Sequence, residues 1–121
     1  MRQRGDVTWF AIDCLIHTSP KIILLSEKLG LDIDATVGKI ARLWSFAKQS
    51  RTEDGNIGKL PFDEVAGIMR WKKKPSDLVN SLIECGLLET NVNGEMIIHD
   101  WYEMNGKAAE RARIDCERHR K

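Results

Sequence analysis

An α+β fold that is mostly helical is predicted from two features of this chain. The first is a pair of helix-forming stretches, 60–69 and 76–85, separated by a short basic turn. The second is a pair of short apolar stretches, 87–90 and 96–99, on either side of Asn93-Gly94. Asparagine and glycine both tolerate positive φ, which suits the tight turn of a β-hairpin. The sequence therefore predicts helix, turn, helix and hairpin in that order.

The residues before position 50 predict one strand and two further helices. Residues 7–16 are rich in aromatic and β-branched side chains, which favours a strand. Ser19-Pro20 predicts a helix start, because serine can cap free amides and proline suits the first helical position, and Gly30 predicts the helix end. Asp34 is expected to cap a longer helix, and Gly38 within it to mark a close helix contact, since glycine weakens a helix by about 1 kcal/mol relative to alanine. The expected buried stripes are Ile22, Leu25 and Leu29 in the first helix and Val37, Ile40, Ala41, Leu43, Trp44 and Ala47 in the second.

The stretch Gly55-Asn56-Ile57-Gly58 leaves room for one more short strand before the helix pair. Together these elements predict a winged helix-turn-helix, in which a helix pair lies beside a small sheet whose hairpin forms the wing. We expect this domain over residues 1–105, with an extra N-terminal strand and helix, and a basic helical tail or linker over residues 106–121. The stretch from Asp34 to Trp101 should suffice to close the core, which leaves the apolar residues of 7–30 as surplus.

Size and charge limit the possible functions. At 121 residues, 42% of them hydrophobic, the chain is long enough for one domain with a real core. Residues 107–121 hold six basic and three acidic side chains, which gives this segment a net charge of +3. The formal net charge of the whole chain is +1, so the remaining residues have a net charge of −2. A nearly neutral body with a basic tail is unlike the broadly basic domain of a strong, nonspecific nucleic-acid binder.

Three cysteines, Cys14, Cys85 and Cys116, are widely spaced and form no C-x-x-C pair. We therefore expect no zinc site, no disulfide framework and no cofactor, and a reducing cytoplasmic location. No apolar run reaches the length of a membrane span, and the amino terminus lacks the apolar region of a signal peptide, so no membrane association is expected.

Several short motifs occur in an order that resembles a known family. They are Ser19-Pro20-Lys21-Ile22, Leu43-Trp44, Asp54-Gly55, Trp71, Pro75, Leu82-Ile83, Cys85-Gly86-Leu87 and Ile98-His99-Asp100-Trp101. Over residues 7–105 the chain resembles the amino-terminal winged-helix domains of phage replisome organisers and of DnaD-type primosomal proteins. The resemblance implies a role in DNA replication initiation, by DNA binding, by homo-oligomer formation, or both, with a helicase or its loader as a partner. Among the DnaD-type relatives, oligomer formation is the better-known role of this domain.

The turn between the two helices of the pair is the first candidate DNA contact. Arg70, Lys72, Lys73 and Lys74 place four positive charges in five positions. The last two lie just before a helix whose amino end presents free N–H groups and a positive dipole end, so an anion such as a phosphate would be needed to offset the charge. The alternative is that these side chains are simply solvated in a surface turn.

The second helix of the pair offers polar side chains for base contacts. Ser76, Asn80 and Ser81 are expected to face away from the core, where the latter two could contact base edges, whereas Asp77 and Glu84 on the same face would repel phosphates. The predicted wing, residues 91–95, contains no Lys or Arg. Further phosphate contacts are expected from Arg111 and Arg113 in the tail, and overall affinity for DNA is expected to be modest.

Aromatic and apolar residues predict both core packing and self-association. Trp71, in the turn, is expected to fill the space between the two helices, although stacking on a base is the alternative. An extended segment at the edge of a sheet leaves unpaired backbone groups, which a second copy of the chain could pair. The predicted oligomer interface is Trp9, Phe10, Ile12 and Leu15, with the alternative that Trp9 and Phe10 cover the domain's own core.

An enzyme is not expected. His99-Asp100 is similar to the dyad of metal-dependent phosphohydrolases, but that chemistry needs further His and Asp ligands on helices, and His17 is the only other candidate in the body of the chain. No nucleophile elbow and no glycine-rich phosphate loop occur. His99 is instead expected to be hydrogen-bonded near the sheet edge.

The favoured interpretation is a DNA-binding and/or assembly module of a phage-type replication initiation protein. One alternative is a protein–protein oligomerisation domain that touches DNA little or not at all. Another is a small transcriptional regulator of the winged-helix type. The basic turn favours DNA contact, while the acidic helix face and the uncharged wing favour assembly.

Overall fold

The computed structural model describes residues 10, 12, 14–50, 52, 54–99 and 101. Within these residues the fold is α+β, with four α-helices, a short 3-10 helix and a small antiparallel sheet. The elements in chain order are η2 (Ile16–Thr18), α1 (Pro20–Leu29), α2 (Ile33–Gln49), β1 (Asn56–Gly58), α3 (Phe62–Ile68), α4 (Pro75–Glu84), β2 (Leu88–Thr90) and β3 (Met96–Ile98). None of these helices is both long enough and apolar enough to cross a lipid bilayer.

Helix α1 begins and ends where the sequence predicts. Pro20 occupies its first turn, and Gly30 terminates it with a left-handed φ of 69°. The predicted serine cap is wrong, because the Ser19 side chain makes no capping hydrogen bond. Local backbone geometry, set by proline and glycine, therefore defines both ends of this helix.

Helix α2 is capped two residues earlier than expected. Asp32 has an extended backbone, and its Oδ1 accepts a hydrogen bond of 2.7 Å from the Ala35 N–H. Asp34 lies inside the first turn instead, where its negative charge interacts favourably with the positive end of the helix dipole. The close helix contact predicted at Gly38 is also wrong, because a Cβ placed there would have no atom within 4 Å.

The sheet has three antiparallel strands in the order β1-β3-β2. Strand β3 pairs with β2 through Leu88 opposite Ile98 and Thr90 opposite Met96. Leu88, Met96 and Ile98 are buried, so one face of the hairpin packs on the core. The short strand predicted at residues 55–58, just before the helix pair, and the predicted hairpin are both confirmed.

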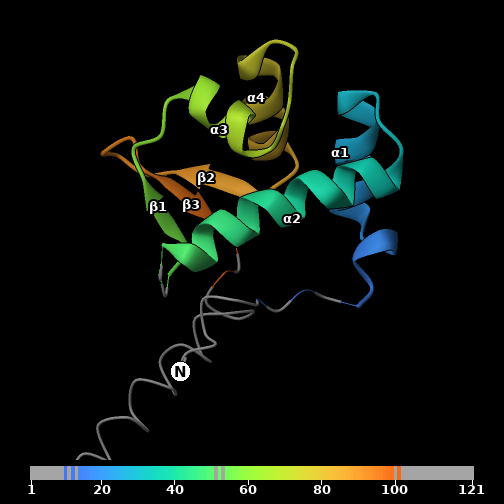
Figure 1. Cartoon of the computed structure of the whole chain (residues 1–121), viewed down its shortest axis with the longest axis horizontal. Helices are drawn as coiled ribbons and strands as arrows, with labels where there is room; N and C mark the ends of the chain where they lie inside the picture. Colours follow the sequence, from blue (N-terminus) through green and yellow to red (C-terminus); the bar gives the residue numbers. More distant parts are fainter. Residues whose placement is uncertain are drawn as a thin grey trace, which may run out of the picture.

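One hydrophobic core joins all of these elements. Helix α2 spans the molecule from α1 at one end to the sheet at the other, with α3 and α4 lying over it (Figure 1). The most deeply buried side chains of the core are Ile22, Leu25, Ile40, Leu43, Val65, Met69, Leu78, Val79, Leu82, Leu88, Ile98 and Trp101. Ile22, Leu25 and Leu29 of α1 belong to this core, so the prediction that the apolar residues of 7–30 are surplus is wrong for α1. Burial of such side chains drives folding, and α1 is therefore an integral part of the domain.

The strand predicted over residues 7–16 is not present among the residues described there. Cys14 and Leu15 form a turn, and Ile16 begins η2. Both the N–H and the hydroxyl of Thr18 donate to the Leu15 carbonyl at 3.0 Å, so the chain satisfies its polar groups locally. Figure 1 shows this segment below α1, with the sheet at the other end of α2. The sequence predicts that this segment forms an edge strand and pairs with a second copy of the chain, but the described residues do not form that strand.

Candidate nucleic-acid interface

Trp71 closes the turn between α3 and α4 from the inside. Its side chain is only 8% exposed, and its indole Nε1–H donates a hydrogen bond of 3.0 Å to the Lys74 carbonyl. Its backbone N–H donates to the Ala66 carbonyl at 2.8 Å, which satisfies the carboxyl end of α3. The predicted packing role of Trp71 is confirmed, and base stacking on this ring would require the turn to open.

Four exposed cationic side chains lie in the same turn as this buried ring. Arg70, Lys72, Lys73 and Lys74 are all exposed, and the Lys73 Nζ lies 5.8 Å from the centre of the Trp71 ring. Helix α4 starts directly after Lys74, so the turn meets the amino end of that helix. None of the ion pairs within the described residues involves these four side chains. Their charge is therefore available to an anion.

Arg70 holds a backbone conformation that normally favours glycine. Its φ is +59°, the one positive value at a non-glycine residue in the described part of the chain. The Lys39 Nζ, reaching over from α2, donates to the Met69 and Arg70 carbonyls at 3.3 Å and 2.9 Å. A non-glycine residue in this region costs about 1–2 kcal/mol, so an arginine side chain is kept here at the expense of stability.

Replacing this arginine separates its charge from its backbone strain. Arg70→Gly should raise the free energy of unfolding by about 1 kcal/mol, because glycine adopts the left-handed conformation without penalty. Arg70→Ala removes the same charge but keeps the strain, and should leave stability near that of the unmodified protein. Urea denaturation of both variants measures the difference. A glycine variant no more stable than the alanine variant would contradict this account of the turn.

The outward face of α4 is narrower than the sequence indicates. Asn80 is exposed and Ser76 is half-buried, but Ser81 is buried at 9% exposure. Ser81 lies on the side of α4 against which α1 packs, so its predicted outward orientation is wrong. Asn80 is the best placed of the three to contact a base edge, with Asp77 and Glu84 one turn before and after it on the same face.

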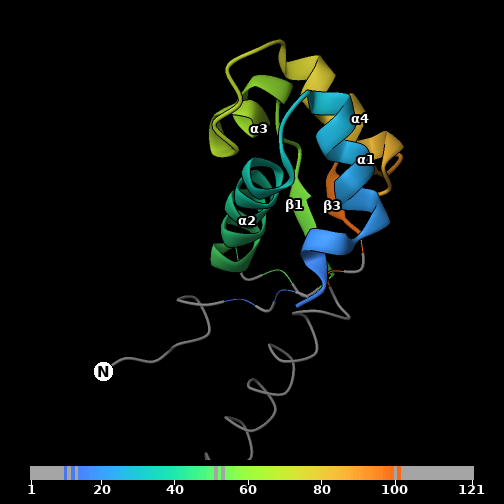
Figure 2. The same ribbon diagram turned by 90° about the vertical axis from the view of Figure 1, so that its right-hand side faces the viewer.

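Helix α1 and helix α4 form the two walls of a polar cleft of about 510 Å³. Figure 2 shows the two helices side by side. The cleft is lined by Lys28, Leu29, Trp71, Lys73, Asp77, Asn80, Ser81 and Glu84. The Lys28 Nζ lies 3.0 Å from the Glu84 Oε1, and the hydrogen bond and charge of Glu84 raise the pKa of Lys28 above its ordinary value. Sequence reasoning did not find Lys28, because no pattern along the chain indicates that α1 packs on α4.

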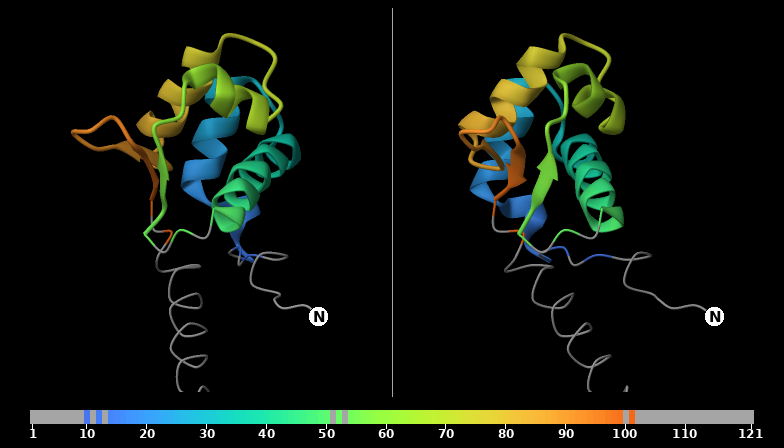
Figure 3. Two further views of the ribbon diagram at one scale, coloured as in Figure 1. Left: turned by 60° about the vertical axis from the view of Figure 1, so that its left-hand side comes forward. Right: turned by 90° about the vertical axis from the view of Figure 1, so that its left-hand side faces the viewer.

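The β2–β3 hairpin projects from the body of the protein (Figure 3). The Asn91 Oδ1 accepts hydrogen bonds of 3.0 Å from the N–H groups of Asn93 and Glu95. The amides of Asn91 and Asn56 donate to the Glu95 carboxylate at 2.9 Å and 3.2 Å, and these hydrogen bonds lower the pKa of Glu95 below its ordinary value. Val92 at the tip is fully exposed. The hairpin is thus internally ordered but presents no cation to DNA.

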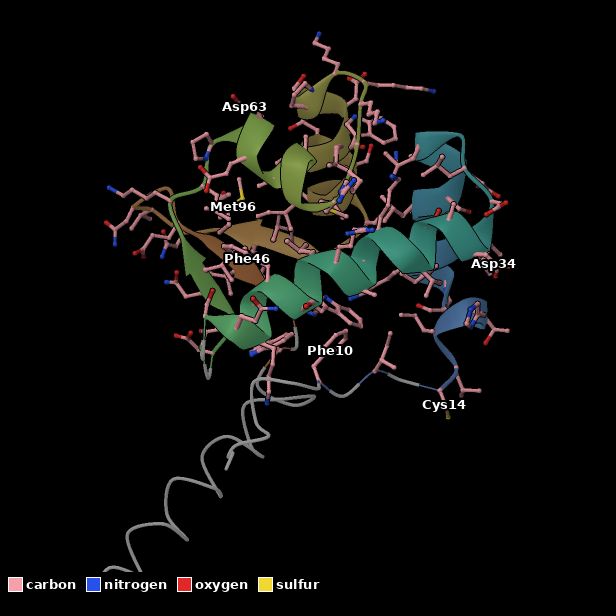
Figure 4. The ribbon with its side chains drawn as sticks, in the orientation of Figure 1. Phe10, Cys14, Asp34, Phe46, Asp63 and Met96 are labelled. Atoms are coloured by element: carbon pink, nitrogen blue, oxygen red, sulfur yellow. The ribbon has the colours of Figure 1, made fainter. Side chains whose placement is uncertain are left out.

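The predicted oligomer interface is distributed unevenly. Phe10 lies beneath α2 (Figure 4), where its ring meets Trp44 edge-on at 6.5 Å between ring centres. It covers the protein's own core, which is the alternative that the sequence left open. Ile12 and Leu15 are 41% and 66% exposed. Trp9 lies outside the described residues, as do Arg111 and Arg113 of the predicted DNA contacts.

The two histidines in the described part of the chain, His17 and His99, lie apart from each other, and each lies near one carboxylate. The His99 Nδ1 lies 2.8 Å from the Glu89 Oε2 across the β2–β3 pair, which matches its predicted hydrogen-bonding role, while His17 lies 3.8 Å from Asp34 near α2. Within the described residues, no group of three or more His, Cys, Asp or Glu side chains is placed to hold a metal ion.

Comparison of this chain with protein-family models, with curated proteins and with solved structures gives no match. A function for this chain is therefore inferred from the geometry of its described residues. In this geometry, the densest group of exposed cations coincides with the amino end of a helix whose outward face is polar. That combination suits a polyanion with base edges to contact.

Proposed function

We propose that this protein binds duplex DNA as a winged helix-turn-helix module, with α4 as its recognition helix. The support is topological. Helix α2, strand β1, helices α3 and α4 and the β2–β3 hairpin follow one another in the order such a module requires, and β1 pairs with the last strand, β3. In this arrangement the second helix of the pair enters the major groove and the hairpin lies beside it.

The observation that carries the proposal is the basic turn at the amino end of α4. Arg70 and Lys72 to Lys74 are exposed, and the helix dipole adds positive potential at the same place. Two phosphates of a DNA backbone crossing this turn would meet both the lysines and the positive end of the helix dipole. Asn80, about one turn further along, would then face the base edges, where an amide suits adenine.

We further propose that DNA binding serves the assembly of a replication-initiation complex. The support is the resemblance of residues 7–105 to replisome organisers and primosomal proteins. A homo-oligomer and contacts with a helicase or its loader belong to this proposal. A transcriptional regulator, which is the alternative, would use the same fold and the same DNA interface. The two functions therefore differ in the partner proteins that they require.

A lysine-to-glutamine series tests the DNA interface. The triple variant Lys72→Gln, Lys73→Gln and Lys74→Gln should weaken binding to an unrelated duplex, because each lost phosphate contact releases about one counterion fewer. The slope of log K against log salt should fall by roughly 2–3 for the three lysines. Fluorescence anisotropy over a salt series gives both values.

The matched control for this series is Arg42→Gln, since Arg42 is an exposed cation on α2 that lines a different groove. It should leave the affinity and the salt slope nearly unchanged. Binding by the unmodified protein that did not depend on salt, or an equal loss in control and triple variant, would contradict the proposed interface.

A second candidate function is assembly without significant DNA contact, and two observations favour it. The hairpin lacks cations between residues 91 and 95, and Val92 at its tip is fully exposed. Ile12 and Leu15 add exposed apolar surface near the start of α1. Apolar side chains on a protruding, ordered element are typical of protein–protein contacts.

A further inference from the structure

The outward face of α4 presents a difficulty for a helix that contacts DNA. Asp77 and Glu84 are exposed on the same face as Asn80, one turn before and one turn after it. Carboxylates repel the phosphate backbone that lines both sides of a major groove. Asp77 lies in the first turn of α4 and lines the same cleft as Lys73, so a cation of the basic turn and the positive end of the helix dipole offset its charge. Glu84 lies at the other end of the helix, away from that turn.

A side chain from a different helix meets Glu84. The Lys28 Nζ of α1 lies 3.0 Å from the Glu84 Oε1, in an ion pair whose side chains are 35% and 60% exposed. A second lysine of α1, Lys21, donates a hydrogen bond of 3.1 Å to the Gly86 carbonyl just beyond α4. Helix α1 is thus attached to the carboxyl end of α4 at two points. Its buried residues Leu25 and Leu29 fix it in the core, so Lys28 is presented from a rigid element.

We infer that α1 is part of the DNA interface: Lys28 neutralises Glu84 and so makes the exposed face of α4 compatible with a duplex, leaving Asn80 as its uncharged centre. This inference rests on the proposed function, because it assigns a role within the same interface. It goes beyond the basic turn, because it extends the interface across the α1–α4 cleft to an element outside the helix pair. Lys28 acts here as a positioning residue through Glu84 and not as a direct reader of DNA.

A double-mutant cycle on Lys28 and Glu84 tests the inference. Glu84→Gln should tighten binding to an unrelated duplex by about fivefold, which is what removing one unit charge near a phosphate yields in water. Lys28→Gln should weaken binding by a similar factor, because it exposes the Glu84 charge. The double variant should bind like the unmodified protein, because the two side chains carry no net charge in either protein. The control is Glu27→Gln, which removes an exposed carboxylate from α1 outside the cleft and should change affinity little.

Fluorescence anisotropy at one fixed salt concentration measures all five proteins, and thermal melts verify that each is folded. Unchanged binding by Glu84→Gln, together with a double variant that binds as weakly as Lys28→Gln alone, would overturn the inference, because Lys28 would then act on phosphate without any influence of Glu84. A flat cycle, with binding still reduced by changes at the basic turn, would overturn it as well and leave the proposed function intact. Absence of any duplex binding by the folded, unmodified protein would instead refute the proposed function itself.

Discussion

Trp71→Ala is expected to destabilise the protein by about 3–5 kcal/mol, the usual cost of deleting a buried aromatic side chain. The ring is 8% exposed and belongs to the single hydrophobic core, so its removal leaves a cavity between α3 and α4. The loss also breaks the hydrogen bond of 3.0 Å from its Nε1 to the Lys74 carbonyl. A small domain is stable by only about 5–15 kcal/mol, so this change is a large part of the total. Urea denaturation followed by circular dichroism measures it.

The matched control is Trp71→Phe, which keeps much of the apolar volume but loses the N–H donor. It should cost roughly 1–2 kcal/mol, the cost of one lost hydrogen bond and imperfect packing. A denaturation curve for Trp71→Ala that coincides with that of the unmodified protein would show that the ring is not part of the core. In that case base stacking on Trp71 would again be open.

Gly55→Ala is expected to destabilise the protein by about 2–5 kcal/mol, because two separate penalties add. The φ of Gly55 is +87°, a conformation that side chains disfavour. A Cβ at this position would also lie 2.6 Å from the Ile98 carbonyl oxygen and 2.7 Å from the Trp101 Cβ. Neither neighbour can move easily, since Ile98 is paired in β3 and Trp101 donates a hydrogen bond of 2.9 Å to the Thr52 carbonyl.

Gly58→Ala separates the two penalties. Gly58 has nearly the same φ, +86°, but a Cβ there would have no atom within 4 Å. It should therefore cost only the backbone penalty of about 1–2 kcal/mol. Thermal or urea denaturation of the two variants gives the steric contribution at Gly55 by difference. Equal losses in both variants would be evidence against the close approach of the chain between Gly55 and Trp101.

The parts of the fold with strong local signals could be predicted from the sequence. Pro20 and Gly30 fix the ends of α1 through their own backbone preferences, which do not depend on the rest of the molecule. Gly94 likewise closes the hairpin turn at a φ of +79°, with its N–H donating to the Asn91 carbonyl at 3.0 Å, whereas Asn93 does not take the positive φ expected from the sequence. The four cations of the basic turn were identified from the sequence as well, because they lie together in the chain.

The remaining features depend on contacts between distant segments, which one sequence does not reveal. Ser81 has the spacing of an outward residue, but α1 covers it. The pairing of Lys28 with Glu84 joins positions 56 residues apart, with no local signal. The aromatic composition of residues 7–16 favours a strand, yet the described part of that segment forms a turn and the start of η2, because local hydrogen bonds compete with sheet pairing. Intrinsic preference is a weak guide in such cases.

Binding of duplex DNA through the basic turn and α4 can be tested most directly by light scattering after size-exclusion chromatography. The protein is run alone and with an equimolar duplex at low salt, and the Lys72, Lys73 and Lys74 triple variant is run as the control. For the unmodified protein we expect a joint peak whose mass exceeds that of the duplex by at least one chain of 13.8 kDa, and for the triple variant we expect this peak to be lost. Separate elution of the folded protein and the duplex at low salt, with both masses unchanged, would contradict such binding.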